Sequence, residues 1–173
     1  APRPPDLRFP NAPVVLVVVD TLRSDRLPFY GYVSGATPAL SALREDSILF
    51  ESAWSPVPLT LPAHSSLFTG VPPGVHRVLD NGGYRLGPSL PTLAGILKGQ
   101  GYATGGAVSC VILAGATGIS RGFDFWEDRI EPEAPVNLAK GGVLRPGNHP
   151  ELDELRHITG HAKELLLAIQ QRE

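Results

Sequence analysis

The sequence has almost no cysteine and no hydrophobic run of membrane-spanning length. Its single cysteine, Cys110, excludes an intrachain disulfide but leaves the redox compartment undecided, because exported proteins can also lack disulfides. The longest strongly apolar run, Val14 to Val19, is far shorter than the roughly 20 residues of a membrane span. Residues Ala1 to Pro5 also lack the charged and apolar parts of a secretory signal.

An excess of charge of either sign is also missing. The formal net charge is -2 and the sequence pI is about 6.2. Such a balance provides no electrostatic attraction to nucleic acid or to an anionic membrane. We therefore expect no nucleic acid among the partners of this chain.

The apolar content is sufficient for one domain, since 42% of the 173 residues are hydrophobic. The 19 glycines and 18 prolines lie mostly between apolar runs, which is typical of tight loops around a sheet. We expect a proline-rich amino-terminal segment over residues 1–12 and one α/β domain over residues 13–173.

Alternating strand and helix signals predict an α/β fold with a doubly wound, mostly parallel sheet and helices on both faces. The Val and Leu residues of 14–19 do not alternate with polar residues, which is the pattern of a strand buried on both faces. In chain order we expect a strand over 14–19, a helix from Pro38 to about Asp46, a strand over 47–53, a helix over 61–69, a helix from Pro91 to about Gly101, a strand over 102–109, loop with anchoring aromatics over 122–150, and a helix over 151–171.

Three residues are candidates for chemistry at the carboxyl edge of this sheet. Asp20 directly follows the first strand signal, where it can bind a divalent cation or only cap the next turn. Thr60 precedes a helix, where free N–H groups and the helix dipole favour an anion, or it is a plain N-cap. His64 lies one turn after Thr60 and can contact an anion, protonate a leaving group, orient Thr60, or serve only packing.

Two further polar residues, His76 and Asn81, fall in a stretch that we expect to be a loop. Loops carry binding residues disproportionately often. The alternative is that Asn81-Gly82-Gly83 forms only a turn.

Taken together, these landmarks resemble the sulfatase family of the alkaline phosphatase superfamily, from Asn11 to about Asp128. The matching features, in order, are the strand ending at Asp20, Tyr30-Gly31-Tyr32 with Thr37-Pro38, the segment from Thr60 to Gly70, His76 with Asn81, Leu93 to Tyr102, and Gly118 to Phe123.

The resemblance implies a hydrolase of sulfate esters that acts through a covalent intermediate on Thr60. It implies that Asp20 and Thr60 are metal ligands, that His64 is catalytic, and that His76 and Asn81 bind substrate. The implied cofactor is a divalent metal, either calcium, zinc or manganese. The implied substrate is a small-molecule, glycan or lipid ester, and an extracytoplasmic location, periplasmic or membrane-attached, is favoured.

The chain departs from the usual sulfatase signature Cys/Ser-x-Pro-x-Arg, which reads here as Thr60-Leu61-Pro62-Ala63-His64. Because of its extra methyl group, Thr60 is not expected to be converted to formylglycine. Thr21 stands where sulfatases have a second carboxylate. Threonine nucleophiles are typical of phosphodiesterase and phosphotransferase relatives, so these activities are the first alternative, and a non-catalytic fold relative is the second.

The metal site that the resemblance implies is also incomplete. Relatives add an Asp-His pair later in the chain, and no Asp-His dipeptide occurs after Asp80. Asp153 and His157 are spaced for one helix face but suit an amphipathic surface helix better. We therefore expect the domain to be incomplete at its carboxyl end, with the missing half of the same domain as a partner, and the isolated chain to be inactive.

Overall fold

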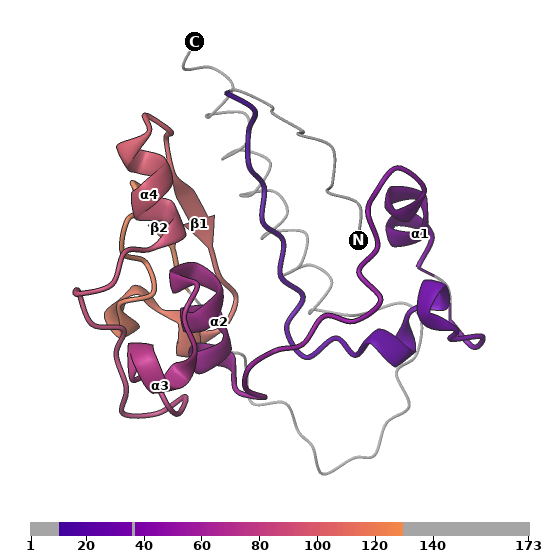
Figure 1. The fold of residues 1–173 in the computed structure, drawn as a ribbon, viewed down its shortest axis with the longest axis horizontal. Coiled ribbons are helices and arrows are strands. Elements are labelled where there is room, and N and C mark those ends of the chain that lie inside the picture. The colour runs from indigo at the N-terminus through magenta and orange to yellow at the C-terminus, as the bar shows by residue number, and fades with distance from the viewer. Residues whose placement is uncertain (1–10, 36, 130–173) are drawn as a thin grey trace, which may run out of the picture. The chain divides into compact units, whose positions relative to one another are not determined.

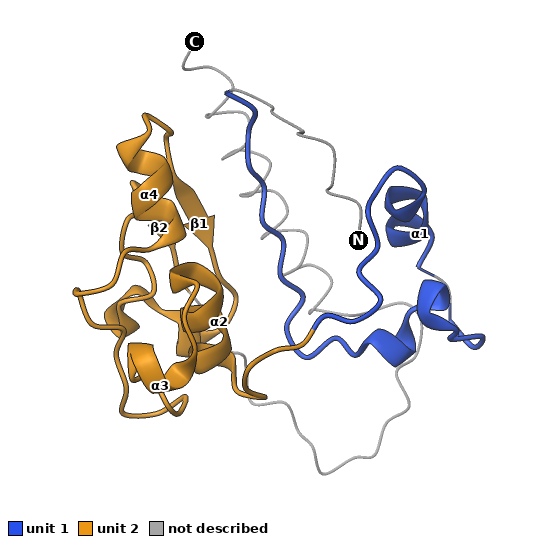
Figure 2. Cartoon of the chain, in the orientation of Figure 1, with its two compact units in different colours: residues 1–53 blue, residues 54–173 orange. Residues whose placement is uncertain are grey.

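A computed structural model describes residues 11–35 and 37–129 of the chain (Figure 1). The chain divides into two compact units, residues 1–53 and residues 54–173 (Figure 2). The part of the expected loop from 130 to 150 and the helix expected over 151–171, with Asp153 and His157, lie outside the described residues. Within the described ranges, no helix has the length and apolar character to span a bilayer.

The first unit contains two short 3-10 helices, η1 (Ser24–Arg26) and η2 (Pro28–Tyr30), and helix α1 (Pro38–Glu45). Helix α1 confirms the helix predicted from Pro38 to about Asp46. Proline at the first helical position has its φ preset for a helix and has no N–H that would lack an acceptor there. The hydroxyl of Tyr30 donates to the carbonyl of Phe50 at 2.7 Å and so connects η2 to the segment after α1.

The strands predicted over 14–19 and 47–53 are wrong for this structure, since neither segment is a strand in it. A strand exists only where a neighbouring strand takes up its backbone hydrogen bonds, and the described part of the first unit contains no strand at all. The apolar side chains of residues 14–19 are 44% to 76% exposed. Residues 14–19 therefore have the sequence pattern of a strand buried on both faces, but their side chains are exposed in this structure.

The second unit holds the nucleophile candidate and most of the regular structure. Its elements are α2 (Thr60–Thr69), α3 (Pro73–His76), α4 (Leu93–Gly99), β1 (Gly105–Ala107), η3 (Val111–Leu113), η4 (Gly115–Thr117) and β2 (Phe125–Glu127). Helices α2 and α4 confirm two predicted helices. The predicted strand over 102–109 is present only in its centre, as β1. Helix α3 and strand β2 lie where loop was expected.

Strands β1 and β2 pair in parallel, with Gly106 opposite Trp126. A Cβ on Gly106 would lie 2.5 Å from the Trp126 ring, so the glycine lets the indole lie against the strand. The glycine that weakens the strand signal in the sequence is therefore required by the packing. The parallel pair agrees with the α/β class, and a doubly wound sheet stays a prediction.

A small buried core holds the second unit together. Its members come from α2, the segments that follow α3, η3 and the turn after η4: Leu61, Val78, Leu86, Leu113 and Ile119. Leu61 is fully buried and directly follows Thr60. Burying a leucine side chain stabilises a fold by about 2 kcal/mol, so this residue fixes the first turn of α2 on the core.

A second connection joins α4 to the chain before β1 and β2. The carboxylate of Asp124 accepts hydrogen bonds from the backbone N–H and the hydroxyl of Thr104, both at 3.0 Å, and pairs with Lys98 at 2.6 Å. The hydrogen bond from Lys98, followed by those from Thr104, lowers the pKa of Asp124 to about 2. The carboxylate is therefore ionised, and able to accept these bonds, down to strongly acidic pH.

The start of α4 packs directly on the backbone of Gly122. Thr92, which is 3% exposed, caps the helix by accepting from Gly95 N–H at 3.2 Å and donates to the carbonyl of Arg121 at 2.8 Å. Gly122 has a φ of +96°, and a Cβ there would lie 2.8 Å from the Cα of Gly95. Both the backbone conformation and the close approach therefore require glycine.

Replacing Gly122 by alanine tests this packing. We expect Gly122→Ala to lower the free energy of unfolding by about 3 kcal/mol, because left-handed strain adds to a steric clash. Gly83→Ala is the matched control, since Gly83 has a φ of +77° and open space around it. It should cost only about 1 kcal/mol of left-handed strain. Equal losses in denaturant titrations of the two variants would contradict the packing.

Candidate active site

Asp20 lies in the first unit, in a tight turn rather than at the end of a strand. Its carboxylate accepts from the backbone N–H of Thr21 at 3.0 Å, and Leu22 N–H donates to the carbonyl of Val19 at 3.4 Å. Thr21 has a φ of +58°, a left-handed conformation that costs a β-branched residue about 1–2 kcal/mol. The residue that replaces the usual second carboxylate is thus the strained residue of this turn.

Thr60 is the first residue of α2, as the sequence predicts. It is half-buried, and Leu59 before it has an extended backbone and no side chain able to cap the helix. The helix ends at Thr69, where Gly70 takes the left-handed conformation and donates to the carbonyl of Ser66 at 2.8 Å. The nucleophile candidate therefore stands at the positive end of the helix dipole.

The N–H groups expected to be free at this helix end are largely taken up. Leu61 N–H donates to the side-chain oxygen of Asn81 at 2.9 Å, and the regular helical bonds begin with Ala63 N–H, which donates to the carbonyl of Leu59 at 2.9 Å. Pro62 has no N–H. The expectation of several free donors for an anion is therefore wrong, and the helix dipole is what this helix end still offers to an anion.

His64 is held against the same turn of the helix. Its Nδ1 lies 2.8 Å from the carbonyl oxygen of Thr60 and its ring packs edge-on against Phe68. A carbonyl can only accept, so Nδ1 carries a proton and donates it. In the neutral ring Nε2 then has the lone pair, which leaves this nitrogen for proton transfer or for a ligand. His64 is 8% exposed.

Asn81 is the cap of α2, supplied from a segment that follows the helix by more than ten residues. The Leu61 N–H requires an acceptor, so it fixes the side-chain oxygen of Asn81 toward the helix. The amide nitrogen is then the end that remains for other partners. This residue is half-buried beside the first turn of α2.

His76 is the last residue of α3 and not part of a loop, and it is only 5% exposed. Its Nε2 lies 2.9 Å from the hydroxyl oxygen of Ser66, and its Nδ1 accepts from Val78 N–H at 3.1 Å. Burial lowers the pKa of the His76 imidazole, and the carbonyls of Pro62 and of His76 itself oppose this effect. Sequence reasoning missed Ser66, because nothing in the sequence distinguishes it from Ser65.

The structure thus brings Thr60, His64, His76 and Asn81 together around α2 in the second unit. Asp20 belongs to the first unit. A shared site of Asp20 and Thr60 therefore stays a prediction.

The described residues do not complete a metal site. Residues 11–35 and 37–129 contain no group of three or more His, Cys, Asp or Glu side chains placed to hold a metal ion. Asp20 and Thr60 supply at most two ligating side chains, whereas zinc takes about four ligands and calcium about six to eight oxygens. These two residues fit only part of a metal's coordination sphere.

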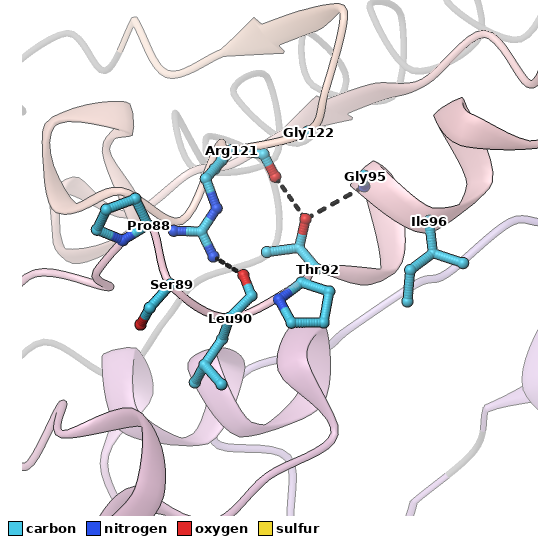
Figure 3. Close-up of a pocket in the computed structure, with 9 residues that line it drawn as sticks. Pro88, Ser89, Leu90, Thr92, Gly95, Ile96, Arg121 and Gly122 are labelled. Carbon is cyan, nitrogen blue, oxygen red and sulfur yellow. Dashed lines mark hydrogen bonds between the residues drawn. The ribbon is translucent and has the colours of Figure 1, made fainter.

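A solvent-open hollow of about 510 Å³ lies elsewhere in the second unit, beside the start of α4 (Figure 3). Arg121 lines it, but its guanidinium already donates to the carbonyls of Gly87 and Leu90. None of Thr60, His64, His76 and Asn81 lines this hollow. The arginine fastens the loop before α4 and is not arranged as an anion receptor.

The family model described as Sulfatase matches residues 12–140, well over half of the sequence. The chain belongs to the sulfatase family. The match confirms the resemblance stated from the motifs of the chain and implies the alkaline-phosphatase-like α/β fold of the family.

Several curated proteins are similar to short stretches of the chain. The DNA mismatch repair protein MutS of Chlorobium phaeobacteroides is 51% identical over 47 residues, and that of Solibacter usitatus is 48% identical over 46 residues. Each alignment covers 27% of this chain and 5% of the relative, so the chain spans about 5% of the length of these proteins. No solved structure matches the chain.

The cap provided by Asn81 can be tested on the chain as it stands. Asn81→Ala should lower the free energy of unfolding by about 1 kcal/mol, because the Leu61 N–H loses its acceptor. Asn81→Asp keeps an oxygen in place and should retain most of the stability. Denaturant unfolding together with hydrogen exchange of the Leu61 amide measures both effects. Unchanged exchange of that amide in Asn81→Ala would contradict the cap.

Proposed function

We propose that this domain hydrolyses sulfate esters through a covalent intermediate on Thr60. The observation that carries the proposal is the placement of Thr60 at the first position of α2, with the turn held on both sides. His64 donates to the carbonyl of Thr60, and Asn81 accepts from the N–H of the next residue. A nucleophile must be held in one geometry to gain from proximity.

In the proposed reaction, the Thr60 oxygen attacks the sulfur of the ester. A bond forms between that oxygen and sulfur while the bond from sulfur to the leaving alcohol breaks. The hydroxyl proton passes to a base, and the leaving alcohol takes up a proton. Water then attacks the sulfur, which releases sulfate and restores the threonine hydroxyl.

The neighbouring polar residues have separate proposed roles. His64 has Nδ1 fixed on the helix, so its Nε2 is the atom that takes up a proton and passes it to the leaving group, and in the protonated ring it can donate to a sulfate oxygen. Asn81 has its oxygen fixed on Leu61, so its amide N–H groups are the donors for a substrate oxygen. His76 was expected to bind substrate, and its burial and internal hydrogen bonds favour a different role, developed below.

We also propose a divalent metal, calcium, zinc or manganese, with Asp20 and Thr60 among its ligands. A bound metal would stabilise charge on the transferring group and lower the pKa of the hydroxyl. The remaining ligands would come from residues other than those described. The ester substrate and an extracytoplasmic location rest on the family alone.

A phosphodiesterase or phosphotransferase is the second candidate. Thr60 favours it, because a threonine cannot be expected to yield formylglycine. His64 stands where sulfatases have an arginine, and it suits either ester, because a sulfate monoester and a phosphate diester each carry one negative charge. A third candidate, a relative without catalysis, has no specific observation in its favour.

Substitutions of Thr60 in the natural full-length protein test the proposal. Thr60→Ala should abolish turnover, with kcat falling by about 10³-fold or more, because the attacking oxygen is removed. Thr60→Ser keeps the hydroxyl and should retain a measurable part of kcat. Assays on an aryl sulfate, a phosphate monoester and a phosphate diester identify the ester class. Near-normal turnover by Thr60→Ala would exclude direct attack by this residue.

A further inference from the structure

The contact between Ser66 and His76 has the distance of a serine nucleophile and its general base. The serine oxygen lies 2.9 Å from Nε2 of the imidazole, and both side chains are buried, with exposed fractions of 9% and 5%. In a nucleophilic pair the imidazole accepts the serine proton. The protonation state of the ring therefore decides what this contact does.

The backbone fixes that state. Val78 N–H points at Nδ1 of His76 at 3.1 Å, and an N–H group can only donate, so Nδ1 must have its lone pair. The proton of the neutral ring then lies on Nε2, which donates it to the Ser66 oxygen. Burial keeps the ring neutral, since it lowers the pKa of His76. The nitrogen that faces Ser66 cannot accept its proton, so the pair does not make a nucleophile.

The same contact joins α2 to the segment that follows it. Ser66 and Thr60 belong to one helix, about 9 Å apart along its axis and about 120° apart around it. His76 holds α2 at Ser66, and Asn81 holds it at Leu61. Two fixed points on one rigid helix prevent both its sliding and its rotation. Thr60 directly precedes Leu61, so the two hydrogen bonds, at Leu61 and at Ser66, also fix the position of Thr60.

We propose that Ser66 and His76 are positioning residues that hold α2, and through it Thr60, in the attacking geometry. The inference rests on the proposed nucleophilic role of Thr60. It gives His76 a part in the reaction without contact to the substrate. A displacement of about 1 Å at a reacting atom can reduce a rate by about 100-fold, so a contact about 1.7 turns away affects catalysis.

Kinetics of the natural full-length protein provide the first test. Ser66→Ala and His76→Leu should each lower kcat by roughly 10- to 100-fold with KM changed by less than about twofold. The kcat of the double variant should be no lower than that of the less active single variant, because both substitutions remove the same contact. His76→Gln restores an N–H donor and should recover part of kcat.

Ser65→Ala is the matched control. Ser65 is fully buried on the same helix, and its hydroxyl has no hydrogen-bond partner among the residues that the structure describes. Its loss should leave kcat unchanged. A raised KM in His76→Leu, together with an unaffected Ser66→Ala, would overturn the proposal in favour of substrate binding by His76. Wild-type kcat in Ser66→Ala would also overturn it.

A spectroscopic measurement does not depend on turnover. Long-range proton–nitrogen correlation spectra of the 173-residue chain should show His76 protonated on Nε2 and unprotonated on Nδ1. In Ser66→Ala the amide signal of Leu61 should shift, and in Ser65→Ala it should not. The opposite tautomer overturns the positioning role. Turnover by Thr60→Ala with the expected tautomer would instead reject the proposed function and leave the hydrogen bond established.

Discussion

The hydrogen bond from Leu61 N–H to Asn81 is the interaction on which the rest of the site depends. It acts together with the burial of the Leu61 side chain, which fixes the same residue on the core of the second unit. The side chain and the backbone of one residue are thus both held, and the residue before it is Thr60. The first turn of a helix normally frays, and these two contacts hold it, and with it the Thr60 hydroxyl, in one position.

Two histidines, His64 within this helix and His76 after it, are set in opposite tautomers by backbone groups. His64 faces a carbonyl with Nδ1, so this nitrogen is protonated, whereas His76 faces an N–H with Nδ1, so this nitrogen is not. The first ring keeps a lone pair on Nε2 for a proton or a ligand, and the second uses its Nε2–H to hold Ser66. The proposed chemical role of His64 and the proposed positioning role of His76 therefore follow from the backbone group that each ring faces, and not from the distance of each ring from Thr60.

Local sequence signals predicted the helices, but contacts between residues far apart in the sequence could not be predicted. Proline at the start of α1 and glycine after α2 gave the limits of two helices from the sequence alone. Strand β2 was missed because its three residues pair with β1 over a distance that no local pattern reveals. The apolar run at 14–19 reads as a strand because its side chains require burial, which the described first unit does not provide. One-turn spacing predicted that Thr60 and His64 lie together on α2, whereas the cap by Asn81 and the bond from His76 to Ser66 join residues that only the fold brings together.

In the proposed reaction, the Thr60 oxygen carries the transferred group during turnover. Mass spectrometry after rapid acid quenching of the natural full-length protein, with an aryl sulfate or a phosphate diester as substrate, can detect this intermediate. We expect a sulfuryl or phosphoryl group on Thr60 and an unmodified threonine in the resting protein. An aldehyde-bearing residue at this position, or the group on another side chain, would contradict it.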